Sequence, residues 1–107
     1  DGLIKGRLGA DMDVTQGAAA ARACGLALLA QANAALGSLD RVARVVKLGG
    51  FVNSTATFTD QPEVINGCSD LMVEVFGDKG RHARSAVGVY KLPLGFAVEV
   101  DAIVEIR

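Results

Sequence analysis

Alanine and other small apolar residues dominate the first part of the chain and predict one long helix. Asp11, Asp13 and Thr15 precede the run, and short polar side chains accept hydrogen bonds from the free N–H groups at a helix start. The helix is expected from about Gln16 to Leu36, with a glycine just past its end. Small interior residues would let this helix lie close against a sheet.

The same region is the most apolar stretch of the chain, so a membrane span has to be weighed. It contains Arg22, Gln31 and Asn33 and consists mostly of alanine, which favours a buried helix of a soluble protein. The chain starts at Asp1 without an apolar leader, and we predict a cytoplasmic protein. Because it does not start with methionine, the sequence is interpreted as a fragment or a trimmed chain.

A second helix is predicted after Thr59, with Pro62 in its first turn and Gly77 as its end. Apolar residues recur at helical spacing along it and form one stripe, which we assign to the sheet face. The stripe comprises Val64, Ile65, Cys68, Leu71, Met72, Val75 and Phe76.

Three segments have the valine-rich or alternating pattern of strands: 41–53, 85–90 and 96–106. Gly49 and Gly50 interrupt the first and predict a bulge or a close approach of the backbone. The turn at 91–95 suggests that the last two strands form a hairpin. Residues 3–8 are expected to form a brief edge strand or an extended arm.

This order of elements predicts an α+β fold, with two helices packed on one face of a mixed sheet. No third helix is available to cover the second face, so we expect the chain to associate with copies of itself. At 107 residues it is interpreted as a single domain, spanning 1–107.

Composition argues against several classes of function. The net charge is -1 and aromatic residues make up 5%, whereas nucleic-acid binders are usually basic and carry stacking aromatics. Cys24 and Cys68 fall among apolar residues and are interpreted as buried thiols rather than reactive ones. With one histidine and no Cys/His cluster, a zinc site is not expected.

The segment 80–85 is the strongest candidate for chemistry, because Arg81, His82 and Arg84 place three donors within four residues. A guanidinium matches a carboxylate through two parallel hydrogen bonds, as a site for a small organic acid requires. The alternative is a solvated basic loop or a structural ion pair, which spacing alone favours.

Two further residues are weaker candidates. If the hairpin forms, Glu99 lies opposite about Val87, near the strand that starts with Arg84, and could hold a water or move a proton. A structural ion pair or a solvent-facing position is equally compatible with the pattern. Asn66 could donate to a ligand, although a surface amide is the commoner outcome.

Several separated motifs resemble the RidA family, also called the YjgF family. The segment 84–93, RSAVGVYKLP, followed by 98–102, VEVDA, is similar to the family's C-terminal signature. The segments 45–53 and 64–66 resemble the preceding strand and helix. The resemblance extends over nearly all of the chain from about Gly6 onward.

The resemblance implies a chorismate mutase-like fold and a homotrimer with clefts between subunits. Typical members hydrolyse enamine and imine intermediates, such as 2-aminoacrylate, to 2-oxo acids and ammonia, without a metal or organic cofactor. By resemblance, Arg84, followed by Ser85 and Ala86, binds the substrate carboxylate, Glu99 assists the attacking water, and Asn66 lies near the cleft. The family has also been labelled as ribonuclease or translation inhibitor.

The chain departs from the family pattern in two places. Ala86 occupies the position where deaminating members carry a cysteine, which acts largely through its backbone. The two N-terminal strands of the family, with a Ser-Gly-Gln motif, are expected before Asp1 and are missing. Three hypotheses therefore stand: an imine deaminase, a non-catalytic module that binds small carboxylates, and an RNA-cleaving protein.

Overall fold

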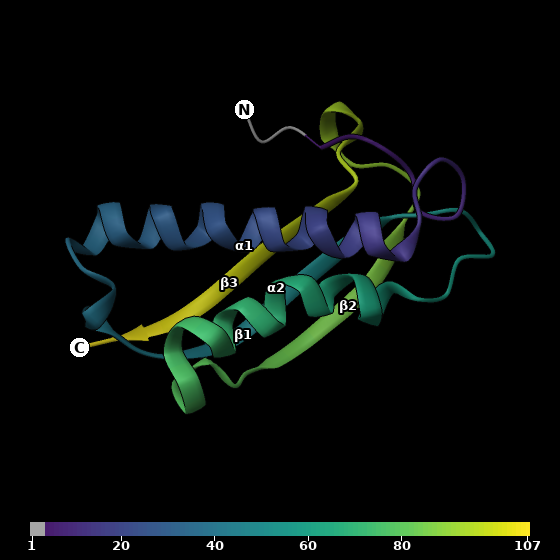
Figure 1. Cartoon of the computed structure of the whole chain (residues 1–107). Helices are drawn as coiled ribbons and strands as arrows, with labels where there is room; N and C mark the ends of the chain where they lie inside the picture. Colours follow the sequence, from purple (N-terminus) through teal and green to yellow (C-terminus); the bar gives the residue numbers. More distant parts are fainter. Residues whose placement is uncertain (1–3) are drawn as a thin grey trace.

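The computed structural model describes residues 4–107 and consists of one layer of helices on one face of a three-stranded sheet (Figure 1). The two helices are α1 (Val14–Leu36) and α2 (Gln61–Phe76). The strands are β1 (Val42–Asn53), β2 (Ala83–Val89) and β3 (Val98–Ile106). Short 3-10 turns, η1 (Leu39–Arg41), η2 (Gly77–Gly80) and η3 (Pro93–Gly95), join them. The predicted α+β architecture is confirmed.

β1 is the central strand of the sheet, whose order is β2-β1-β3. It pairs with β2 in parallel through the α2 crossover and with β3 in antiparallel. The predicted hairpin between the last two strands is therefore wrong, because β1 lies between them. The 91–95 turn instead includes η3 and carries the chain across the end of the sheet from one edge to the other.

α1 begins where the acidic residues predicted, two residues earlier than expected. Asp13 accepts a hydrogen bond from the backbone N–H of Gln16 (2.8 Å), whose side chain accepts one from the N–H of Asp13 (2.9 Å). This reciprocal pair satisfies two of the free donors at the helix start. Gly37 ends the helix with φ 83°, a left-handed conformation that glycine adopts without strain.

The inner face of α1 is made of small residues, as the sequence predicted. Gly17, Ala20, Ala21 and Gly25 are its buried residues. By length and apolar content alone, α1 is long enough to cross a membrane, but the core helix of a soluble protein meets the same criteria. Only 17% of the most apolar stretch of α1 is buried, so the helix covers the core with one face. The prediction of a buried helix is therefore correct for that face alone.

α2 also follows its sequence signals, with Pro62 in its first turn and Gly77 as its cap. The buried stripe comprises Val64, Ile65, Cys68, Leu71 and Met72. Val75, which we had assigned to the stripe, is 42% exposed. By helical spacing Val75 belongs to the same face, but it lies in the last turn of the helix, where its side chain stays exposed.

The core lies between the sheet and the two helices, and the opposite face of the sheet is open. The core joins helix residues to the inward residues of all three strands. On the open face, Val87 is 44% exposed and Ile103 is 59% exposed, and Tyr90 beyond β2 is 74% exposed. A sheet face that carries exposed apolar residues is typical of a surface that a partner covers. The expectation that no third helix covers it holds for residues 4–107.

The paired glycines of β1 make room for side chains, and neither lies at a bulge. A Cβ on Gly49 would lie 2.5 Å from Oδ1 of Asp101, and one on Gly50 would lie 2.5 Å from Cδ1 of Ile65. The register shifts occur earlier in the strand, between Val42 and Arg44 and between Val45 and Lys47. The close-approach alternative is therefore correct, with side chains filling the space.

Cys68 gives a testable consequence of core burial. It is fully buried, and burial raises the pKa of its thiol from 9.0 to about 11. Between these values the unfolded chain releases the thiol proton and the folded chain keeps it, so stability is lost as the pH rises. We expect the free energy of unfolding to fall between pH 9 and 11 less in Cys68→Ala than in the native chain. Urea denaturation of both chains across this range measures the difference; parallel curves would contradict the assignment.

Candidate functional site

Arg84 lies on β2, an edge strand, and its side chain turns toward α2. Its Nη1 donates to Oγ of Ser69 (3.1 Å) and its Nη2 donates to the backbone carbonyl of Pro62 (3.2 Å). The side chain is half-buried, so these two bonds fix a guanidinium that remains partly open to solvent. Its other N–H groups are available to a ligand.

His82 and Ser69 hold the arginine through a chain of hydrogen bonds. Nδ1 of His82 lies 2.5 Å from the carbonyl oxygen of Gly80, which can only accept, so Nδ1 carries a proton. In the neutral imidazole, Nε2 then accepts from the hydroxyl of Ser69 (2.9 Å). With the imidazole in this tautomer, Ser69 donates to His82 and accepts from Arg84.

These side chains line an open cavity of about 270 Å³ between α2 and the start of β2. Asn66, Ser69, Arg81, His82 and Arg84 all line it, so the structure brings four residues singled out from the sequence to one place. Arg81 is paired with Asp78 (3.3 Å). Within residues 4–107, no carboxylate lies within salt-bridge distance of the Arg84 guanidinium. Asp70 also lines the cavity, but the Arg84 guanidinium is a positioned cation that forms no ion pair with it.

Glu99 does not join this cavity within one chain. It alternates along β3 with Val98 and Val100, which are buried under the helices, so Glu99 faces the open side of the sheet. Arg84 contacts α2 on the helix side. The predicted proximity of Glu99 to the Arg84 strand is therefore wrong for a single chain.

The register explains how the prediction failed. Glu99 pairs with Phe51 of β1, and Phe51 pairs on its other side with Val87. The predicted row across the sheet was right, but β1 separates the two residues by two strand spacings, about 10 Å.

The two residues after Arg84 point to opposite faces. Ser85 is exposed, and by strand alternation it lies on the open face with Glu99. Ala86 is half-buried and packs against the core. If either contributes to a site at Arg84, it does so through its backbone, as the resemblance implied for the position of Ala86.

Ser69 is the residue that sequence reasoning missed. It lies 13 residues before His82, so no local motif joins them. The spacing of Asn66, Ser69 and Val73 along α2 carried a signal, because residues three and four apart share a helix face. These three residues line the cavity beside the apolar stripe.

No other arrangement in the described part of the chain suggests a cofactor. Residues 4–107 contain no group of three His, Cys, Asp or Glu side chains placed to hold a metal ion. The cavity at Arg84 is lined by one carboxylate, Asp70, and by the donors of Arg81, Arg84 and Asn66, and these donors suit an organic anion.

Comparison with known proteins gives close relatives over the whole chain. Protein TCP17 of Trypanosoma cruzi is 61% identical over 107 residues, which are 99% of this chain and 67% of that protein. The crystal structure of protein Atu1372 from Agrobacterium tumefaciens, of unknown function, is 50% identical with a TM-score of 0.95, covering 96% of this chain and 66% of that one. The chain thus spans about two thirds of the length of these relatives.

More distant structures share the fold. The crystal structure of Escherichia coli TdcF with bound serine has a TM-score of 0.58 at 23% identity, covering 90% of this chain and 66% of TdcF. The family model described as "YjgF/chorismate_mutase-like, putative endoribonuclease" matches residues 1–106. With an α+β fold of the same kind and a family match over almost its entire length, the chain belongs to the YjgF/chorismate mutase-like family, the RidA family that its C-terminal motifs resemble.

Proposed function

We propose that this protein is a hydrolytic deaminase of small enamine and imine intermediates of the 2-aminoacrylate type. The observation that carries the proposal is the guanidinium of Arg84, held by Ser69 and the Pro62 carbonyl without a carboxylate partner among residues 4–107. A substrate carboxylate would complete the planar fork that these bonds leave open. A small acid bound in this way has its reacting carbon held a fixed distance from Arg84.

The reaction needs water and proton transfer but no redox step. Water adds to the carbon of the C=N group, the nitrogen takes up protons, and ammonia leaves as the carbonyl of the 2-oxo acid forms. A carboxylate near that carbon can accept a proton from the attacking water. Glu99 is the proposed carboxylate, and its position on the open face requires that a second copy bring it to Arg84.

A homotrimer with clefts between subunits is part of the proposal. The exposed apolar side chains of the open face, Val87 and Ile103, support it because association would bury them. TdcF, which shares the fold, binds serine, a small molecule that carries a carboxylate. A ligand of that class is what we propose for the cleft at Arg84.

Ammonia release tests the proposal. The native protein is expected to accelerate ammonia release from a 2-imino acid generated by an amino-acid oxidase. Arg84→Ala is expected to lower kcat/KM by about a hundredfold or more, because the substrate is no longer anchored. Lys79→Ala removes a charge from an exposed position on the neighbouring η2 turn and is expected to leave the rate unchanged.

Other outcomes would favour the alternatives. Binding of a 2-oxo acid that depends on Arg84, without ammonia release, would contradict the deaminase and support a non-catalytic module for small carboxylates. Cleavage of RNA, with binding that weakens steeply as salt rises, would support the ribonuclease label instead.

A further inference from the structure

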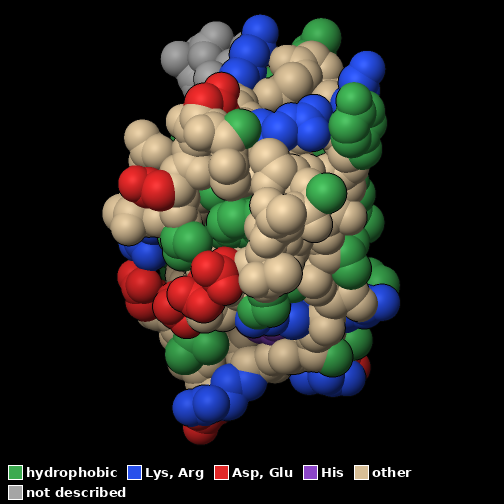
Figure 2. Space-filling view, turned by 90° about the vertical axis from the view of Figure 1, so that its right-hand side faces the viewer, with side chains coloured by type: hydrophobic (Ala, Val, Ile, Leu, Met, Phe, Trp, Pro, Cys, Tyr) green, Lys and Arg blue, Asp and Glu red, His purple; other side chains and the backbone are tan. Residues whose placement is uncertain are grey.

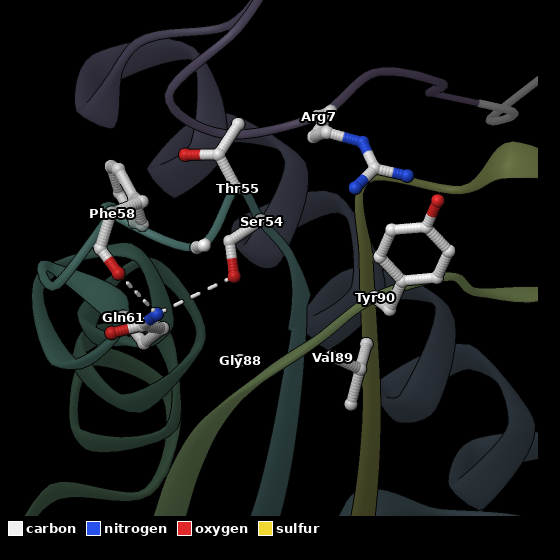
Figure 3. Close-up of a pocket in the computed structure, with 9 residues that line it drawn as sticks. Arg7, Ser54, Thr55, Phe58, Gln61, Gly88, Val89 and Tyr90 are labelled. Carbon is white, nitrogen blue, oxygen red and sulfur yellow. Dashed lines mark hydrogen bonds between the residues drawn. The ribbon is translucent and has the colours of Figure 1, made fainter.

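A second pocket lies at the far end of β2 from Arg84 (Figure 3). It has a volume of about 630 Å³ and shares no lining residue with the Arg84 cavity. Ser54, Phe58 and Gln61 lie on one side of it, and Arg7 lies with Tyr90 on the other. The proposed deaminase reaction makes no use of this pocket, so its residues need a separate account.

Among residues 4–107, Arg7 is the one charged residue that lines the pocket, and no acid lines it. Its guanidinium lies over the ring of Tyr90, with the guanidinium carbon 4.9 Å from the ring centre. Stacking occupies one face of the guanidinium and leaves its N–H edge free. Within residues 4–107, that edge has neither a hydrogen-bond acceptor nor an acidic partner. A half-buried cation of this kind is complementary to an anion.

The residues on both sides of Arg7 are anchored to β1 and its extension. Leu8 donates its N–H to the carbonyl of Asn53 (2.8 Å) and accepts from the N–H of Thr55 (3.0 Å). The buried Asn53 amide donates to the carbonyl of Gly6 (3.1 Å). Because the backbone is fixed before and after it, Arg7 is held in place before any ligand arrives, which reduces the entropic cost of binding.

The opposite side of the pocket is also fixed, and it is partly apolar. Nε2 of Gln61 donates to the carbonyl of Phe58 (2.8 Å) and to Oγ of Ser54 (3.4 Å). The Phe58 and Tyr90 side chains add apolar surface. A Cβ on Gly88 would lie 2.7 Å from both Nε2 of Gln61 and Oγ of Ser54, so this glycine lets the strand approach the amide closely.

Charged side chains of both signs surround the pocket, and the Asp11 carboxylate accepts from the backbone N–H of Arg7 (2.7 Å). Figure 2 looks onto this end of the molecule, and most of its acidic side chains gather on the left of the view. Lys and Arg side chains lie at the top, on the right and at the bottom of the view. The attraction for an anion therefore depends on Arg7 itself, because no acid among residues 4–107 lines the pocket.

We propose that this pocket binds a small organic carboxylate with an apolar or aromatic body, anchored on Arg7, as a second site separate from the Arg84 cleft. The guanidinium edge would bind the carboxylate, and Phe58 would contact the apolar body.

Benzoate and its neutral analogue benzamide test the proposal in the native protein by NMR titration of backbone amides. Benzoate is expected to shift the amides of Thr55 and Gly88, and benzamide is expected to bind about tenfold more weakly, because it cannot form charge-assisted bonds. This comparison requires no variant. Equal binding of the two probes, or shifts confined to Asn66 and His82 at the other cavity, would overturn the proposal.

Charge variants then identify the anchor. Arg7→Gln is expected to weaken benzoate binding about tenfold. Lys91→Gln is the matched control, because Lys91 also lies beside the Tyr90 ring (5.7 Å) but does not line the pocket. Arg84→Ala is expected to leave the shifts at Thr55 and Gly88 intact, so the outcome is independent of the deaminase reaction. Unchanged affinity in a folded Arg7→Gln would contradict the assignment.

Discussion

Replacing Gly67 with alanine is expected to destabilise the protein by about 3 kcal/mol or more, a large share of the stability of a small domain. Gly67 lies at the crossing of α1 and α2, where a Cβ would be 2.0 Å from the backbone oxygen of Ala18 and 2.8 Å from its carbonyl carbon. The two helices would have to move apart, and the core beneath them would lose packing. Thermal or urea denaturation measures the loss.

Gly25→Ala is the matched control, because it also introduces a methyl group on a helical glycine where α1 and α2 pack together. There the nearest atoms are side-chain ends, Cδ2 of Leu71 at 2.8 Å and Sγ of Cys68 at 3.1 Å. Side chains can adjust, and alanine stabilises a helix by up to about 1 kcal/mol relative to glycine. The cost is therefore expected to be well below that of Gly67→Ala.

A second variant separates backbone contact from side-chain contact. Ala18→Gly removes the only side-chain atom at that position, but the clash of Gly67→Ala is with the carbonyl group. The double variant is therefore expected to be no more stable than Gly67→Ala alone. Recovery in the double variant, or a loss of less than about 1 kcal/mol in Gly67→Ala, would mean that the helices are not in backbone contact.

The contrast between helix ends and strand order shows what the sequence could predict. The helix limits at Asp13, Gly37, Pro62 and Gly77 depend on groups a few residues apart, so local patterns located them to within two residues. The valine-rich or alternating pattern of segments 41–53, 85–90 and 96–106 likewise located the three strands. Strand order depends on which strand lies in the middle of the sheet, paired along both edges. The local turn at 91–95 carried no information on which strand that is.

The correct order had a signal that the hairpin interpretation overlooked. β1, α2 and β2 form a strand–helix–strand unit, and such units place their two strands parallel in one sheet. β1 is also the longest strand and the most continuously buried, which is typical of a central position. Taken together, these features would have placed β3 on the remaining edge and Glu99 away from β2.

The residues of the candidate sites likewise fall into those that local sequence identified and those that only tertiary packing brings together. Arg84 and His82 are neighbours in sequence and were found together, whereas Ser69 reaches them only through the packing of α2 on β2. Arg7 was not singled out at all, because a lone arginine in an extended arm has no distinguishing pattern. Its position is defined by two tertiary contacts: the hydrogen bond from the Asn53 amide to the Gly6 carbonyl, and the stacking of the Arg7 guanidinium on the Tyr90 ring.

Two inactive variants of the protein are expected to restore activity when they assemble together. Arg84 faces the helices and Glu99 faces the open side of the sheet, so the proposed cleft must take one residue from each of two subunits. Arg84→Ala and Glu99→Gln are each expected to lower ammonia release by about a hundredfold or more. Co-expressed in equal amounts, they leave about a quarter of the clefts with both native residues.

The mixture of native chain with the double variant Arg84→Ala/Glu99→Gln provides the matched comparison. If the cleft lies between subunits, this mixture also retains about a quarter of the native activity, because arginine and glutamate are drawn independently. If both residues acted within one subunit, this mixture would retain about half and the two single variants together would recover nothing. The pair of measurements therefore determines, from activity alone, whether Glu99 of one copy serves Arg84 of the next.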